Sequence, residues 1–371
     1  MAMTQIETPQ DLRALTALRF FAAAWVALYA FWPNLDIAFA PNLIAKGYLG
    51  VELFFVLSGF ILSHVYLKAF GEGGFRYGGF LWARVARVYP LHLATLIGVG
   101  VLGLGALAAG MAIDGNVLSW ESLPAHIFML HAWGLAPEAG WNHSSWSISA
   151  EWFAYLTFPA FAFVAWRLRD RPLAAVAGAL ALMGLLYAGF QALAGFSLTE
   201  ATFRWGALRI VPCFAYGCAL YLVHRRGDLK HPGWLALASL AGMAIAASLQ
   251  APDGIVVVFA GGLILALGTL PNASAGWLAS RPAVYLGEIS YAVYMVLVPW
   301  QLLAVNAAAR LTGAEDKQLQ LFVWLAVVLA LPLVAALAYQ LVEHPARKAL
   351  RGLADRRAAR AALRRSDPQV A

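Results

Sequence analysis

Charged residues are scarce in this sequence. Asp, Glu, Lys and Arg together make up 12% of its 371 residues, whereas hydrophobic residues make up 62%. A soluble globular domain has about 25% charged residues. The apolar residues fall into runs of roughly 17–24, which is the length that crosses a hydrocarbon layer of about 30 Å. The composition therefore excludes an ordinary soluble protein and predicts an all-α, polytopic transmembrane helical bundle.

Cysteine and the common catalytic and metal-binding motifs are also missing or rare. Cys213 and Cys218 lie in one apolar run, which excludes a disulfide framework. The sequence has no G-x-S-x-G elbow, no H-E-x-x-H motif and no glycine-rich phosphate loop. Its eight histidines show no metal-ligand spacing, and most of them look interfacial. We therefore expect no metal cofactor.

About ten spanning segments can be read from the hydropathy pattern and from the Gly and Pro residues that interrupt it. They cover residues 14–32, 48–68, 88–111, 148–167, 173–194, 207–224, 233–249, 254–271, 284–304 and 319–342. We expect one transmembrane domain over residues 1–346, followed by a basic tail over residues 347–371.

The long loop 112–147 contains no Lys or Arg. If the N-terminus lies in the cytosol, 20 of the 26 basic residues lie on the cytosolic side and four lie on the opposite side. This bias predicts that both termini are cytosolic and that the 112–147 loop faces outward. The net charge of +7 comes largely from the tail, which carries eight basic residues. A basic tail after a spanning helix is typical of contact with membrane lipid, and we expect no nucleic-acid partner.

Charges inside spanning segments are candidates for function because they are expensive in lipid. Arg19 lies a full turn or more inside the first span, where the alternative reading is a side chain that reaches the interface. Glu52 begins the second span and is either functional or interfacial. Arg209 in the sixth span has apolar residues on both sides, and we expect it to hold the bundle together.

Two further groups combine charges or polar residues at span ends. Arg84 and Arg87 are three residues apart, which puts both guanidinium groups on one helical face. Such a pair suits either the phosphates of a nucleotide-containing cofactor or lipid headgroups. The segment 141–153 combines Asn142, His143, several serines and Glu151 with three tryptophans. It reads equally as a carbohydrate-facing surface or as an ordinary aromatic belt.

These features occur together in a set of sequence blocks. The blocks cover residues 18–23, 50–60, 84–90, 145–153, 209–217, 286–294 and 343–345. In this order and on these spans they resemble the acyltransferase-3 family of bacterial membrane O-acyltransferases over nearly the whole chain. The resemblance implies a multi-pass protein of the bacterial cytoplasmic (inner) membrane. It also implies transfer of an acyl group, often acetyl, from cytosolic acyl-CoA to a hydroxyl of a glycan or glycolipid beyond the membrane.

The resemblance also implies roles for the matching residues. Arg84 and Arg87 belong to the acyl-CoA side, and Arg19 is a further cofactor contact deeper in the passage. Glu151 belongs with Trp146 and Ser147 to the acceptor side. We add Asn142 to that side because it stands in the same polar segment.

The chain departs from the family pattern at both expected histidines. The first-span pattern of an Arg, ten residues and a catalytic His begins at Arg19 and ends here on Ala30, and the second expected His position is Leu297. A general base is typically worth 10² to 10⁴ in rate, so we expect impaired transfer. Three explanations remain open: an engineered inactive form made to trap a complex, a natural pseudoenzyme, or a variant that uses another base such as Glu52 or Glu151.

The alternative function is a non-catalytic pseudoenzyme or a membrane carrier. The sequence shows no paired halves with interrupted spans, which are the usual sign of a secondary carrier. Binding of acyl-CoA separates the two ideas, since an acyltransferase scaffold requires it and a carrier does not. The sequence predicts neither the acceptor nor the oligomeric state.

Overall fold

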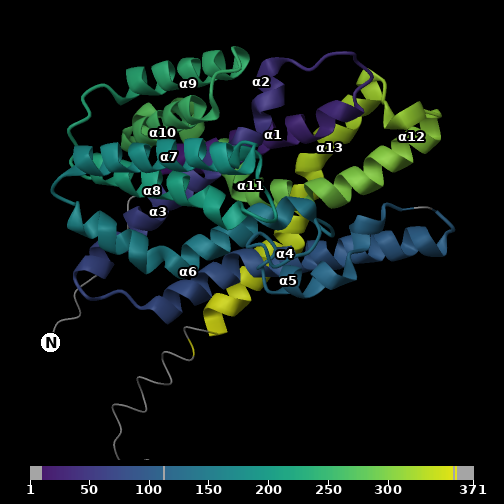
Figure 1. The fold of residues 1–371 in the computed structure, drawn as a ribbon, viewed down its shortest axis with the longest axis horizontal. Helices are drawn as coiled ribbons and strands as arrows, with labels where there is room; N and C mark the ends of the chain where they lie inside the picture. The colour runs from purple at the N-terminus through teal and green to yellow at the C-terminus, as the bar shows by residue number, and fades with distance from the viewer. Residues whose placement is uncertain (1–10, 112, 354–355, 357–371) are drawn as a thin grey trace, which may run out of the picture.

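A computed structural model describes residues 11–111, 113–353 and 356, and these residues form a bundle of long helices (Figure 1). The only β contact in this part of the chain is an isolated bridge between Leu35 and Leu319. The prediction of an all-α polytopic bundle is confirmed.

All ten predicted spans form helices. They are α1 (Arg13–Phe31), α3 (Gly50–Gly71), α4 (Tyr77–Ala108), α6 (Trp146–Arg167), α7 (Pro172–Ala194), α8 (Gly206–His224), α9 (Pro232–Ser248), α10 (Asp253–Thr269), α11 (Arg281–Trp300) and α13 (Leu321–Ala338). Among the described residues, eight spans are long and apolar enough to cross a membrane, whereas α9 and α10 have 17 residues each and are shorter.

Three short helices complete the fold: α2 (Asn42–Ala45), α5 (Leu123–Ile127) and α12 (Asn306–Thr312). A π-helical turn, Gln301–Val305, joins α11 to α12. A second π-helical turn, Tyr339–Glu343, carries α13 onward, so that one helical span runs over Leu321–Leu353. The predicted domain boundary at residue 346 therefore falls inside a helix, and most of the predicted tail lies outside the described residues.

The predicted start of the third span was wrong. Helix α4 begins at Tyr77, not at residue 88, and it includes Pro90 in its interior. Arg84 and Arg87 suggested an interface, but the backbone hydrogen bonds of a helix lie within the segment itself and continue past charged side chains. As a result, both arginines lie inside a helix that packs against the rest of the bundle.

The loops meet in two groups, one at each end of the bundle. At the end predicted to face outward, Lys46 pairs with Asp253, Asn42 Nδ2 donates to Ser248 O at 2.8 Å, and Gln318 Nε2 donates to Pro33 O at 2.9 Å. At the other end, Asn272 Nδ2 donates to Asp11 O at 2.8 Å, Arg226 Nη2 to Asp170 O at 2.7 Å, and Trp82 Nε1 to Leu350 O at 2.9 Å. This grouping agrees with the predicted alternation of the spans.

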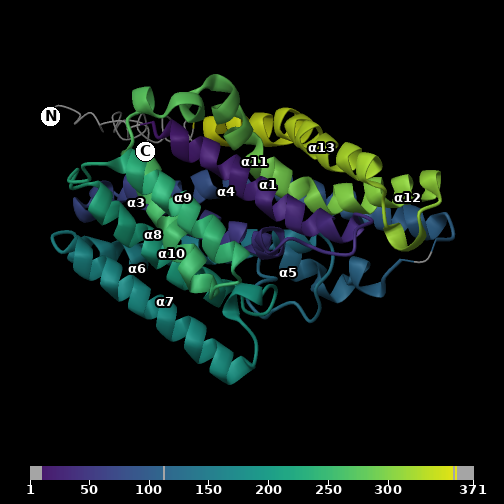
Figure 2. The ribbon, with the colours of Figure 1, turned by 90° about the horizontal axis from the view of Figure 1, so that it is seen from above.

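Glycines allow the central helices to approach closely. A Cβ atom on Gly217 of α8 would lie 2.0 Å from Val56 O of α3, and one on Gly59 of α3 would lie 2.1 Å from Phe214 O of α8. Small residues at a crossing let two backbones touch, as is common in membrane bundles. A Cβ on Gly287 of α11 would lie 1.8 Å from Thr16 O of α1, and Figure 2 shows these two helices side by side. These contacts fix the helices that surround the site.

Candidate active site between five helices

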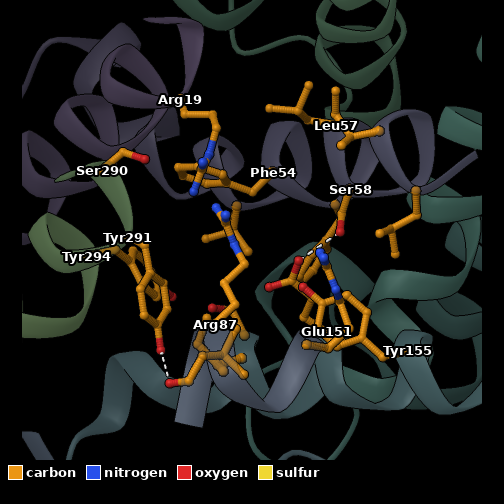
Figure 3. Close-up of a pocket in the computed structure, with 18 of the residues that line it drawn as sticks. Arg19, Phe54, Leu57, Ser58, Arg87, Glu151, Tyr155, Ser290, Tyr291 and Tyr294 are labelled. Atoms are coloured by element: carbon orange, nitrogen blue, oxygen red, sulfur yellow. Dashed lines mark hydrogen bonds between the residues drawn. The ribbon is translucent and has the colours of Figure 1, made fainter. Parts of the chain in front are cut away.

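Helices α1, α3, α4, α6 and α11 enclose a cavity of about 280 Å³ (Figure 3). Nine of its lining residues are apolar. The polar ones are three arginines, one glutamate and seven hydroxyl side chains: Arg19, Arg84, Arg87, Glu151, Thr16, Ser58, Ser147, Ser290, Tyr155, Tyr291 and Tyr294. The cavity therefore combines an apolar wall with an excess of positive charge.

The three arginines come from two helices. Arg19 is on α1, and Arg84 and Arg87 lie about one turn apart on α4. In Figure 3 the side chains of Arg19 and Arg87 extend toward one another from opposite sides. Arg84 lies over aromatic rings, with its Cζ 5.8 Å from the centroid of Tyr155. Its buried Nε has no hydrogen-bond partner among the described residues, so this donor is available to a ligand.

Glu151 is the one carboxylate among the residues that line the cavity. Ser58 of α3 donates a hydrogen bond of 2.7 Å from its Oγ to Glu151 Oε1 on α6 (Figure 3). Both side chains are partly buried. The predicted catalytic candidate Glu151 and the predicted cofactor contacts Arg19, Arg84 and Arg87 thus share one cavity.

Glu52 lies elsewhere. Its Oε1 and Oε2 accept hydrogen bonds of 2.5 and 2.9 Å from Nε and Nη2 of Arg209. Arg209 Nη1 also donates to Ala201 O at 2.8 Å, and its Cζ lies 4.5 Å from the ring centroid of Trp146. Glu52 is fully buried and is not among the cavity-lining residues. Its geometry is that of a structural ion pair that joins α3 to α8.

Neither expected histidine position lines the cavity. Ala30 lies about three turns outward of Arg19 on the same face of α1, because eleven residues make almost a whole number of turns. Leu297 is buried on the adjacent helix α11, and Gln301, one turn further on, donates a 3.0 Å hydrogen bond from Nε2 to Ala30 O. The structure brings the two positions to neighbouring helices at the same end of the bundle.

The residues predicted for the acceptor side do not all line the cavity. Ser147 lines the cavity, whereas Asn142 and Trp146 are buried outside it. Asn142 Nδ2 donates to Thr95 Oγ1 at 3.0 Å and to Met295 O at 2.9 Å. Asn142 therefore ties the segment before α6 to α4 and α11. That contact supports the cavity without facing it.

Sequence reasoning missed a stack of three buried histidines. His126 and His131 have ring centroids 4.1 Å apart, and His92 stacks on His131 at 6.0 Å. The sequence predicts that most histidines are interfacial, but these three are 0–2% exposed. The stack joins the 112–147 loop to α4, and it is not among the cavity-lining residues.

Hydrogen bonds define the protonation of the stack. His92 Nε2 donates to His126 O at 2.8 Å, and His131 Nε2 donates to Ser145 Oγ at 3.0 Å, since the Ser145 hydroxyl itself donates to Asn142 O. The Nδ1 atoms of His92 and His131 are buried without a partner in the part of the chain that the structure describes. Burial lowers the pKa of His126 and lowers that of His131 well below its ordinary value.

Apart from Ser147, the hydroxyl residues that share the cavity with Glu151 were given no role by the sequence. Tyr155 follows Glu151 by four residues, so helical spacing alone places it on the same face. Ser58 carried no comparable signal, because its approach to Glu151 depends on how α3 packs on α6. No group of three or more His, Cys, Asp or Glu among the described residues is arranged to hold a metal ion.

Comparisons with known proteins agree with this architecture. The sequence profile of the acyltransferase-3 family, described as "Acyltransferase domain", matches residues 12–341. Acyltransferase MdmB of Streptomyces mycarofaciens is 29% identical over 331 residues, covering 82% of this chain and 81% of that protein. "Protein 2 in picA locus" of Rhizobium radiobacter is 54% identical over 52 residues, 14% of this chain and 27% of that protein. No solved structure gives a significant match. The chain belongs to the acyltransferase-3 family of bacterial membrane O-acyltransferases.

Proposed function

We propose that this chain moves an acetyl group from cytosolic acetyl-CoA to a hydroxyl of a glycan or glycolipid on the other side of the membrane. It would act as a multi-pass protein of the bacterial inner membrane, in contact with membrane lipid and without a metal or nucleic-acid partner. One observation carries the proposal: Arg19, Arg84, Arg87 and Glu151 line a single cavity inside a spanning bundle.

The arginines support an anionic donor. Three guanidinium groups face one carboxylate in the cavity, so the site carries an excess of two positive charges. Guanidinium groups bind phosphates through paired N–H donors. The buried Arg84 Nε without a partner fits the same reading, because an unsatisfied buried donor is costly unless a ligand completes it.

The position of Glu151 supports the proposed transfer to an acceptor hydroxyl. Acyl transfer to a hydroxyl requires a group that accepts the hydroxyl proton, and an ionised carboxylate can accept it. Glu52 is already held by Arg209, and the buried histidine stack lies outside the cavity lining. Of the candidates for the base, Glu151 has the most suitable position.

The replaced histidine positions favour the alternative of a pseudoenzyme or carrier. Ala30 and Leu297 cannot accept a proton, and a lost general base typically lowers the rate by 10² to 10⁴. We nevertheless favour an enzyme, since the cavity retains a carboxylate beside three cationic groups. Slow transfer is the expected result for this chain.

Binding of acetyl-CoA to the purified protein in detergent micelles tests the proposal. Arg84→Gln and Arg87→Gln should each weaken binding about 10- to 100-fold, the effect of losing a hydrogen bond to a charged group worth about 1.5–3 kcal/mol. Arg167→Gln is the matched control, because Arg167 lies at the end of α6 against Phe163 and outside the cavity. Absence of acetyl-CoA binding, or equal weakening by the control, would contradict the proposal.

A further inference from the structure

Ser58 makes an unusual contact for a hydroxyl in a spanning helix. Serine and threonine in helices commonly donate to a backbone carbonyl within their own helix. Thr16 donates to Leu12 O at 3.4 Å in this way, and Ser290 donates to Gly287 O at 2.7 Å. Ser58 instead donates to Glu151 Oε1 on another helix, and both residues line the cavity. A hydroxyl paired with a carboxylate is the arrangement that activates an oxygen nucleophile.

The cavity is small for a reaction between two large substrates. Its volume of about 280 Å³ is just below that of typical ligand pockets, which range over about 300–1,000 Å³. A donor and an acceptor that enter from opposite ends would therefore occupy it in turn. A reaction in two steps, with the acyl group held by the protein in between, meets that restriction.

The position of Ser58 suits such a step. It lies eight residues from Gly50, the first residue of α3, which is about 12 Å along the helix. Arg87, which we assign to the donor, and Ser147, which we assign to the acceptor, line the same cavity. Ser58 therefore shares the cavity with groups that we assign to both substrates.

We propose that Ser58 takes the acyl group from the donor as an ester and then passes it to the acceptor hydroxyl, with Glu151 as the base in both steps. This inference rests on the proposed acyltransferase function and adds a covalent intermediate to it. The positive charge of Arg19 and Arg87 in the same cavity would stabilise the negative oxygen that develops on the carbonyl in each step.

In the first step, Ser58 Oγ attacks the thioester carbonyl carbon and Glu151 accepts the Ser58 proton. The carbon–sulfur bond breaks, and the CoA thiolate takes the proton from Glu151 and leaves as a thiol. In the second step, the acceptor oxygen attacks the acyl-serine carbonyl and Glu151 accepts the acceptor proton. The bond to Ser58 Oγ breaks and Oγ recovers that proton, so no oxidation or reduction takes place.

The experiment needs no identified acceptor. The full chain in micelles is incubated with acetyl-CoA and isotopically labelled free CoA, and the label that enters acetyl-CoA is measured by mass spectrometry. An acyl-enzyme makes this exchange possible without an acceptor, and quenched protein should gain the mass of one acetyl group on the peptide that contains Ser58. Ser58→Ala should abolish both signals, and Glu151→Gln should slow the exchange about 10²- to 10⁴-fold.

Two variants make the result specific. Ser63→Ala removes a buried serine from the same helix that does not line the cavity, and it should keep both signals. Tyr155→Phe removes the hydroxyl that follows Glu151 by one turn. Exchange that survives Ser58→Ala, or an acetyl group found on Tyr155, would overturn the inference.

Different results would reject the acyl-serine and the acyltransferase function. Acetyl-CoA binding without exchange or acetylated protein would reject the covalent step and leave direct transfer in place. Absence of acetyl-CoA binding would reject the acyltransferase proposal itself, and the acyl-serine with it.

Discussion

Arg209 of α8 and Glu52 of α3 form a two-point ion pair that is closed to solvent. The contacts are 2.5 Å for Nε to Oε1 and 2.9 Å for Nη2 to Oε2, and neither side chain is more than 2% exposed. Removing one partner of such a pair leaves an uncompensated buried charge, which typically costs about 3–5 kcal/mol. Glu52 therefore contributes to the fold of the bundle and does not face the cavity.

This relationship predicts the behaviour of two Glu52 variants. Glu52→Leu should destabilise the protein by about 3–5 kcal/mol, because it strands the Arg209 charge. The double change Glu52→Leu with Arg209→Met should recover most of that loss, because both charges disappear together. Thermal unfolding in detergent measures both effects. A stable double variant without acyl transfer would show instead that Glu52 is needed in the reaction.

The close crossing of α3 and α8 predicts a strong effect of one methyl group. Gly217→Ala places a Cβ about 2 Å from Val56 O, so the helices must move apart, which typically costs about 1–3 kcal/mol. Gly98→Ala on α4 is the control, since a Cβ there has open space around it. That control should be neutral or stabilising by up to about 1 kcal/mol. Equal thermal unfolding of the two variants would contradict the close contact.

Much of the bundle could be predicted because lipid imposes a simple rule on sequence. Spans must be apolar and helical, and basic residues mark one side. The rule failed at Arg84 and Arg87, because charged residues that line an internal cavity give the same sequence pattern as the end of a span. It also failed at Asn142, whose amide reaches Thr95 and Met295 instead of a polar surface.

The contacts between distant segments could not be predicted in the same way. Ser58 and Glu151 are 93 residues apart, and their hydrogen bond depends on how α3 packs on α6. His92 looked like an interfacial residue because its burial depends on a loop that begins well beyond it in the chain. The chemical groups can be read from the sequence, whereas their contacts depend on how the helices pack.

The buried histidine stack predicts acid sensitivity. His126 and His131 have a lowered pKa in the folded protein, so the unfolded chain binds more protons once the pH falls below about 6.5. The neutral histidines should make their full contribution to the free energy of unfolding above that pH. Between about pH 6.5 and 5.5, the free energy of unfolding should fall by up to about 1.4 kcal/mol for each histidine.

Thermal unfolding at several pH values measures this loss. The double variant His126→Gln with His131→Gln should lose less stability between those pH values than the unmodified chain. His231→Gln is the control because His231 is exposed, and it should match the unmodified chain. A loss of stability in acid that is the same in the double variant would show that other groups cause it.

The two replaced positions predict a gain of activity. Ala30→His alone, or together with Leu297→His, should raise acetyl transfer by as much as 10² to 10⁴, the usual contribution of a general base. Release of free thiol from acetyl-CoA measures it. A rate that does not change in either variant, with acetyl-CoA binding intact, would show that Ala30 and Leu297 do not mark the place of a missing base.

The central claim, that this chain is an acyltransferase with Glu151 as its base, is tested most directly in inside-out membrane vesicles. Acetyl-CoA labelled in the acetyl group is added to the exposed cytosolic face, and label in the glycan and lipid fractions is counted. We predict transfer above that of vesicles without the protein. It should be lost on Glu151→Gln and kept on Glu138→Gln, a change at an exposed residue that lies outside the cavity. Transfer that persists without Glu151 would contradict its role as the base. Absence of transfer by this chain and by its Ala30→His form, without acetyl-CoA binding, would contradict the acyltransferase itself.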